Sequence, residues 1–239
     1  MSSTLLRQAT IVHGAVTDGS TDVRVVDGAI AEVGADLAAE DAEVLDLAGW
    51  ILLPAAVEPH AHLDKAFLAE RVENRTGDLA GAIDAMISTS DRITFDDIVE
   101  RAERAARLMA ANGYVAVRTH ADTTEFGGLR NVEALVEVRR RVADVIDVEI
   151  VALTGTPAVG TAGAQHRALL RDAIATGADL VGGCPHLEDH VEGHRAIERA
   201  TDVFLDIAAD AGVGVDLHTD ETLDPDVMGL EYLAHQVLA

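Results

Sequence analysis

The sequence predicts an α/β fold of the (β/α)8-barrel type over residues 51–239, preceded by a small all-β part over residues 1–50. Three observations predict it. After Trp50, apolar strand-like runs alternate with amphipathic helix-like segments, which is the pattern of a parallel sheet covered by helices. Polar residues stand at the ends of successive runs, where barrel active sites lie. No Gly-rich phosphate-binding fingerprint follows the first run, so a dinucleotide-binding sheet has no support.

The N-terminal part consists of short strands and turns. The segment "ATIVHG" predicts one strand, and "AEVLDLAG" predicts another. Between them, "TDVRVVDGAIAEVG" alternates polar and apolar residues and contains Asp27-Gly28, a strong hairpin signal.

The barrel part begins with the apolar run "WILLPAAVEPH". A capping-box-like stretch, Thr94 to Asp97, then opens a helix that stops near Gly113. Four further strands are predicted at "YVAVRTH", "DVEIVALTG", "ADLVGGCPH" and "VGVDLHTDE", with helices between them and a last helix in "PDVMGLEYLAHQVLA". These are about five βα units, whereas a complete barrel has eight in about 250 residues. We therefore expect a barrel truncated after the fifth strand.

Composition excludes several classes of function. The net charge of -24 repels nucleic acid and anionic lipid, so neither is an expected partner. The single cysteine, Cys184, rules out an internal disulfide and a Cys-rich zinc site. The N-terminus lacks the pattern of a signal peptide, and "GWILLPAAV" is too short to cross a bilayer. We expect a soluble cytoplasmic protein.

His60 and His62 are the leading candidates for chemistry. Residues i and i+2 of a strand point to the same face, so both imidazoles can reach one ion, and imidazole suits zinc and iron(II). The alternative is a pair of surface or helix-capping histidines. His218 ends the fifth strand, and Glu221 follows three residues later, where a loop could direct its carboxylate at the ion; alone, each is more often a structural or solvated residue.

Other polar residues at the strand ends are weaker candidates. Thr154 ends the third strand, and His186 and Glu188 follow the fourth; for these two the alternative is loop capping. His120 and Asp122 end the second strand and are weaker still. Lys65, the only lysine, fits best in a salt bridge with Asp64. The stretch "HVEGH", residues 190–194, lacks the zincin arrangement and is interpreted as surface.

The segments "VEPHAHLDKAF", "VRTHAD", "LVGGCPHLED" and "VDLHTDE" resemble, in this order, the cytosine deaminase branch of the amidohydrolase superfamily. The resemblance implies a (β/α)8 barrel with a small β-sandwich part. It implies one divalent metal ion, Fe(II) or Zn, bound by His60, His62 and His218, and a proton shuttle at Glu221. His186 and Glu188 would lie near the substrate pocket. By analogy, a homo-oligomer is expected.

The implied reaction is hydrolytic deamination of a small-molecule nitrogen heterocycle. A divalent ion lowers the pKa of its bound water toward 7, and the hydroxide attacks the ring carbon that carries the amino group. Glu221 would transfer the proton to the ring nitrogen and then to the leaving amine, giving the oxo heterocycle and ammonia. A carboxylated lysine, which bridges two metals in binuclear members, has no candidate on the strands, so a single metal is favoured.

Two departures from the family's pattern matter. Gly155 stands near the place of a glutamine that reads the pyrimidine edge in cytosine-specific members, so a related N-heterocycle or substituted triazine is expected to bind beside Thr154 and Gly155. The family's strand-six histidine and strand-eight aspartate would lie beyond Ala239. We therefore expect an incomplete form with little activity alone. The alternatives are an amidohydrolase acting on a cyclic amide or N-substituted ring, and a non-catalytic remnant.

Overall fold

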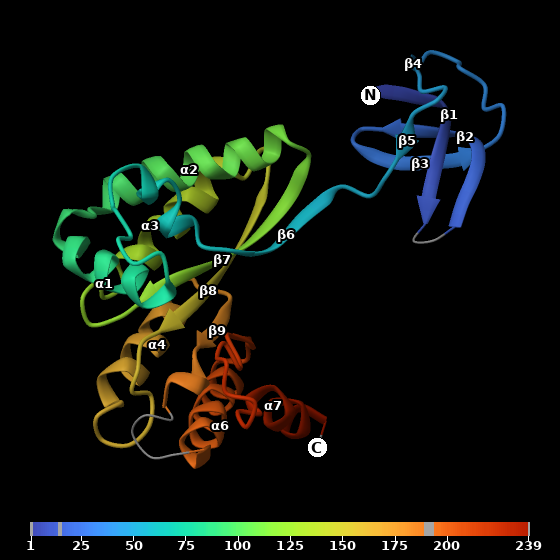
Figure 1. The fold of residues 1–239 in the computed structure, drawn as a ribbon. Helices are drawn as coiled ribbons and strands as arrows, with labels where there is room; N and C mark the ends of the chain where they lie inside the picture. The colour runs from blue at the N-terminus through green and yellow to red at the C-terminus, as the bar shows by residue number, and fades with distance from the viewer. Residues whose placement is uncertain (1, 14–15, 189–193, 239) are drawn as a thin grey trace. The chain divides into compact units, whose positions relative to one another are not determined.

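The computed structural model describes residues 2–13, 16–188 and 194–238, and the chain forms two compact units, Met1–Ala55 and Ala56–Ala239 (Figure 1). Each unit has its own sheet. Of the predicted surface stretch "HVEGH", residues 190–193 lie outside the described residues.

Unit 1 is a five-stranded mixed sheet. Strands β1 (Ser3–His13), β2 (Val16–Val26), β3 (Ala29–Gly34) and β4 (Glu43–Asp46) lie in the order β3-β2-β1-β4, and β5 (Ile51–Leu52) also pairs with β1. The predicted hairpin is present, because Asp27 and Gly28 join β2 to β3 with φ angles of 48° and 81°. Positive φ at both positions is what a tight hairpin turn between twisted strands requires.

Unit 2 contains a parallel sheet of five strands in chain order. These are β6 (Ala56–Ala61), β7 (Tyr114–Thr123), β8 (Asp147–Thr154), β9 (Leu180–Gly183) and β10 (Gly214–Leu217). Every neighbouring pair is parallel, and helices alternate with the strands. Sequential order is the order of a barrel wall. The predicted fold is thus confirmed as a parallel half-barrel sheet with a separate small sheet.

The helices of unit 2 cover the sheet with small and branched apolar side chains. The helices in contact with strands are α2 (Phe95–Ala111), α3 (Arg130–Val142), α4 (Ala164–Thr176) and α6 (His194–Ala211), whereas α7 (Gly229–Leu238) packs against α6. Figure 1 shows α2 and α3 beside one another, and α3 contacts β7 and β8. As predicted, the Thr94 side chain caps α2 by accepting a hydrogen bond from the backbone N–H of Asp97.

Two features differ from the prediction. The apolar run "WILLPAAVEPH" is two strands in different units, β5 and β6, because Pro54 lies between them without an N–H to donate to a ladder. The segment between β6 and α2 also contains an unpredicted helix, α1 (Leu79–Thr89), and the short 3-10 helices η1 (Leu63–Lys65), η2 (Leu68–Glu70) and η3 (Ser90–Arg92). A further one, η4 (Pro185–Glu188), follows β9.

Candidate metal centre and adjoining cavity

The three histidines predicted to share an ion lie together at the C-terminal end of the half-barrel sheet. The ring centroids are 5.3 Å apart for His60 and His62, 4.7 Å for His60 and His218, and 5.6 Å for His62 and His218. One ring nitrogen from each lies within 4.8 Å of the other two. This spacing makes the three histidines a group that could hold one metal ion.

Backbone contacts hold these histidines in place from both sides. The backbone N–H of His60 donates to a carboxylate oxygen of Glu58 at 3.1 Å. The chain after His62 is tied to β7, since the N–H of Leu63 donates to the buried hydroxyl of Thr119 at 2.9 Å. The N–H of His218 donates to the carbonyl of Gly183 at 3.0 Å, so His218 continues the pairing of β10 with β9.

The environment of His62 and His218 favours the neutral imidazole, the form that binds metal. Burial, followed by the charges of Lys65 and His120, lowers the pKa of His62 to about 3. Burial, followed by the charges of His120 and His60, lowers the pKa of His218 to about 4. The Nδ1 atom of His218 is buried and has no hydrogen-bond partner in the described part of the chain. A buried nitrogen without a partner fits a site built to hold a cation.

A fourth imidazole, His120 of β7, completes the cluster. It is fully buried, and its ring centroid lies 4.3 Å from that of His60 and 4.7 Å from that of His218. Its Nε2 lies 3.3 Å from a carboxylate oxygen of Asp216, which also accepts a hydrogen bond from Arg118 at 2.9 Å. The sequence indicated His120 only as a weak pocket candidate. His120 lies next to His60 because β7 pairs with β6, and this pairing cannot be deduced from any local sequence pattern.

Lys65 lies beside the cluster in a network of carboxylates. The predicted pair with Asp64 is present at 3.2 Å, and Asp122 is closer, at 2.8 Å. Burial alone would lower the pKa of Lys65, but the charges and hydrogen bonds of these carboxylates outweigh it and raise the pKa. Asp64 is buried and also accepts hydrogen bonds from the side chain of Asn131 and the N–H of Asp122. The network joins η1 to β7 and α3.

A cavity of about 520 Å³ opens next to this cluster. On one side it is lined by polar residues at the strand ends, namely His62, Asp64, Lys65, Asp122 and Thr154. On the other it is lined by apolar side chains of the unpredicted helix α1, namely Leu79, Ala82, Ile83, Met86 and Ile87. A polar end beside an apolar wall is typical of a small-molecule site.

The remaining predicted site residues fall into three groups. Thr154 and Gly155 line the cavity. His186 and Glu188 are buried and contact backbone: Nδ1 of His186 donates to the carbonyl of His218 at 2.9 Å, and a carboxylate oxygen of Glu188 accepts from the N–H of Ala158. Glu221 is exposed in the loop after β10. Burial, followed by the charge of Glu221, raises the pKa of Cys184 to about 12, which places the carboxylate near the end of β9.

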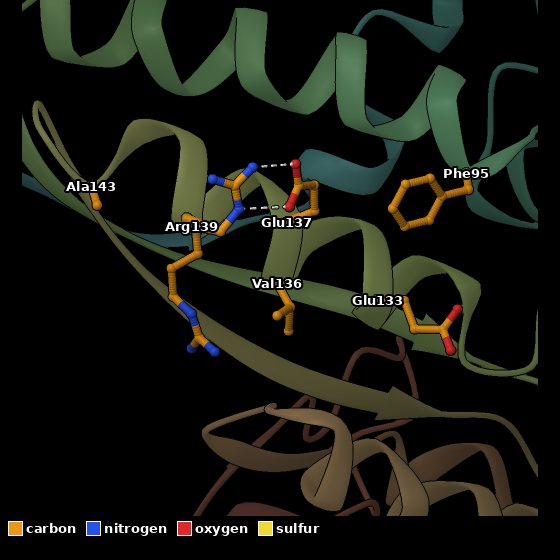
Figure 2. Close-up of a pocket in the computed structure, with 7 residues that line it drawn as sticks. Phe95, Glu133, Val136, Glu137, Arg139 and Ala143 are labelled. Atoms are coloured by element: carbon orange, nitrogen blue, oxygen red, sulfur yellow. Dashed lines mark hydrogen bonds and ion pairs between the residues drawn. The ribbon is translucent and has the colours of Figure 1, made fainter.

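A second hollow, of about 590 Å³, lies on the outer surface of the helices and has a different character. Figure 2 shows residues of α3 lining it together with Phe95, the first residue of α2. Glu137 in this lining forms an ion pair with Arg140 at 2.8 Å. None of its seven lining residues was predicted for the site. The cavity beside the histidines is therefore the candidate site. Within the described residues, no helix has the length and apolar character needed to cross a membrane.

A parallel half-barrel whose strand ends carry a group of histidines that could hold a metal ion defines a class of (β/α)-barrel proteins, and comparison with known proteins narrows that class. The chain is 29% identical to a pterin deaminase of Rhizobium rhizogenes over 219 residues, covering 91% of the chain and 48% of the relative. A scan against protein-family models found no match.

Comparison with solved structures also finds deaminases and related hydrolases. A 5-methylcytosine deaminase of Klebsiella pneumoniae liganded with 5-fluorocytosine matches with a TM-score of 0.81 and 32% identity, covering 97% of this chain and 55% of that one. An N-isopropylammelide isopropylaminohydrolase of Burkholderia multivorans matches with a TM-score of 0.79 and 29% identity, covering 100% and 58%. These homologues and structural neighbours are members of the amidohydrolase superfamily, which confirms the resemblance found in the sequence. The chain spans about half the length of the relatives it matches.

Proposed function

We propose that the chain supplies the metal-binding half of a hydrolytic deaminase that acts on an amino-substituted nitrogen heterocycle. The observation that carries this proposal is the convergence of His60, His62 and His218 beside a cavity of ligand size. The pterin deaminase and the 5-methylcytosine deaminase to which the chain is similar support the choice of reaction.

The proposed cofactor is one divalent ion, Fe(II) or Zn, held by His60, His62 and His218. When bound, such an ion supplies a water molecule whose pKa is lowered enough to act as a nucleophile near neutral pH. A single ion is favoured because Lys65, the only lysine, is occupied by Asp64 and Asp122 and is therefore not available to bridge two metals.

Glu221 is the proposed proton carrier. Its neighbour Asp220 accepts hydrogen bonds from the N–H groups of Gly229 and Leu230, which ties the loop after His218 to the start of α7. Glu221 itself remains exposed. We assign it to accept a proton from the attacking water and to pass it to the ring nitrogen and then to the departing amine. The C–O bond forms, the C–N bond breaks, and the products are the oxo heterocycle and ammonia.

The other predicted residues take supporting roles in this proposal. Thr154 and Gly155 form part of the wall against which the ring would lie. His186 would position the metal ligand His218, because it holds the His218 carbonyl from the adjacent 3-10 helix. Glu188 would hold the loop after β8 through the N–H of Ala158.

A related hydrolysis that releases an alkylamine is the second candidate. The apolar wall formed by Leu79, Ile83 and Ile87 of α1 suits an alkyl substituent. Similarity to the N-isopropylammelide isopropylaminohydrolase supports the same possibility. Scoring a panel of aminopyrimidines and alkylaminotriazines for ammonia and for alkylamine release distinguishes the two reactions.

Metal content tests the proposal directly. The purified chain, loaded with Zn or Fe(II) and dialysed, is expected to retain about one equivalent, and His60→Ala and His218→Ala are expected to lose most of it, because each removes one of three ligands. His235→Ala is the matched control, since this histidine of α7 has a side chain 75% exposed. Unchanged metal content in His60→Ala would contradict the proposal. In any active form, Glu221→Gln should lower turnover by about 10²–10⁴.

A further inference from the structure

His166, in the first turn of α4, is a histidine in the wall of the cavity that the proposed reaction does not use. It is 5% exposed, although helix starts are usually solvated. Its Nδ1 lies 2.9 Å from the carbonyl oxygen of Pro157. A carbonyl oxygen only accepts, so Nδ1 must carry the hydrogen, and in the neutral ring Nε2 then carries the lone pair.

The Nε2 atom of His166 occupies space left by Gly155. A Cβ atom on Gly155 would lie 3.1 Å from Nε2, closer than ordinary van der Waals contact. The absence of a side chain at the end of β8 therefore lets the imidazole approach the backbone there. Gly155 and His166 line the same cavity as His62 of the histidine cluster.

A second acceptor lies beside this nitrogen. A carboxylate oxygen of Glu125 is 3.9 Å from Nε2, and Glu125 also lines the cavity. Lone pairs of an imidazole and a carboxylate on one side of a cavity recognise N–H donors. A ligand edge with an amino group or ring N–H satisfies them, whereas an edge lacking a donor leaves the buried acceptor unpaired.

We propose that His166 is a specificity-determining residue that reads an N–H donor edge of the heterocycle, using the space that Gly155 leaves. The inference rests on the proposed function, because it places the ring in the cavity next to His62. It narrows the ligand class to heterocycles that carry a second donor, such as another amino group, in addition to the amino group that is released.

The test compares two probes that differ by one amino group, 2,4-diaminopyrimidine and 4-aminopyrimidine. Binding of each to the 239-residue chain is measured by calorimetry or ligand-observed NMR. The wild-type chain is expected to bind the diamino probe about tenfold more tightly than the monoamino probe, which corresponds to a difference in binding free energy of about 1.4 kcal/mol. His166→Phe is expected to bind both probes equally, and His166→Gln, whose amide oxygen can accept, is expected to keep part of the preference. Because the measured quantity is the ratio of the affinities for the two probes, a loss of folded protein in a variant affects both probes equally and leaves the ratio unchanged.

A spectroscopic readout separates recognition from a structural role at the Pro157 carbonyl. In a chain labelled with 15N-histidine, the Nε2 resonance of His166 should show an unprotonated nitrogen that shifts with the diamino probe and not with the monoamino probe. A preference that persists in His166→Phe, an Nε2 that is protonated, or equal binding of both probes by the wild-type chain would each overturn the inference. The proposed reaction fails separately, through metal content that is unchanged in His60→Ala.

Discussion

Replacing Asp64 by Asn tests whether the carboxylate network beside the histidines stabilises unit 2. Asp64 has a fully buried side chain and lies 3.2 Å from Nζ of Lys65. It also accepts from the side chain of Asn131 at 3.0 Å and from the N–H of Asp122 at 3.2 Å. An Asn side chain has nearly the same shape, but its NH₂ group would face donors where an oxygen now accepts.

The expected loss in the free energy of unfolding depends on which interactions of Lys65 and of the buried donors remain after the substitution. Removing one partner of a buried ion pair costs about 3–5 kcal/mol when the other charge is left uncompensated. Lys65 keeps Asp122 at 2.8 Å, and its side chain is 28% exposed, so part of that penalty is relieved. Loss of a charge-assisted hydrogen bond costs about 1.5–3 kcal/mol. We therefore expect the free energy of unfolding to fall by about 2–3 kcal/mol.

Urea unfolding followed by circular dichroism at 222 nm measures this loss, because every described helix lies in unit 2. Asp122→Asn is the matched control. It removes the other carboxylate from the same lysine, but the Asp122 side chain is 31% exposed, so a loss of about 1 kcal/mol is expected. If Asp64→Asn costs no more than Asp122→Asn, burial of the carboxylate does not set the energetics of the network and the reasoning is wrong.

Two further results are expected. Gly183→Ala should lower the free energy of unfolding by about 1–3 kcal/mol in the same assay, because its Cβ would lie 2.4 Å from the buried ring of Phe204, while Gly127→Ala, with nothing nearer than 3.9 Å, should have little effect. In the metal-free chain the pKa values of His62 and His218 are lowered from 6.5 to about 3 and about 4, so the unfolded chain binds protons that the folded chain does not. Stability should be full above pH 6.5 and fall as the pH decreases toward 4, and a urea midpoint independent of pH over that range would contradict this.

The fold was largely predictable because each strand of the half-barrel carries its signal locally. The run that became β8 is apolar on both faces, as a strand covered by helices must be. Turn and cap residues were equally local: Asp27-Gly28 adopts the hairpin turn, and Thr94 caps α2. The division of one apolar run into β5 and β6 was not predictable from hydropathy, because apolar residues continue from Ile51 to Val57 and only the pairing partners of the two strands differ.

Site residues were predictable when their position followed from the alternation of side chains along a single strand. Residues that reach the site through contacts between different elements were not predictable. His60 and His62 follow from their spacing. His120 joins them through the pairing of β7 with β6, and the apolar wall of the cavity comes from α1, whose five apolar lining residues were not assigned to a helix from the sequence. His166 is distant in sequence from every strand end, and the contact with Gly155 that distinguishes it exists only in three dimensions.

The three histidines proposed to bind the ion lie on or just after the two edge strands of the five-stranded sheet, β6 and β10. In a flat sheet, four strand spacings of about 4.8 Å would separate these edges by about 19 Å. The rings of His60 and His218 are 4.7 Å apart, so the sheet is bent until its first and last strands face each other across the interior. An ion bound there would link the two edge strands of the sheet. The affinity for that ion would therefore depend on how strongly the sheet is curved.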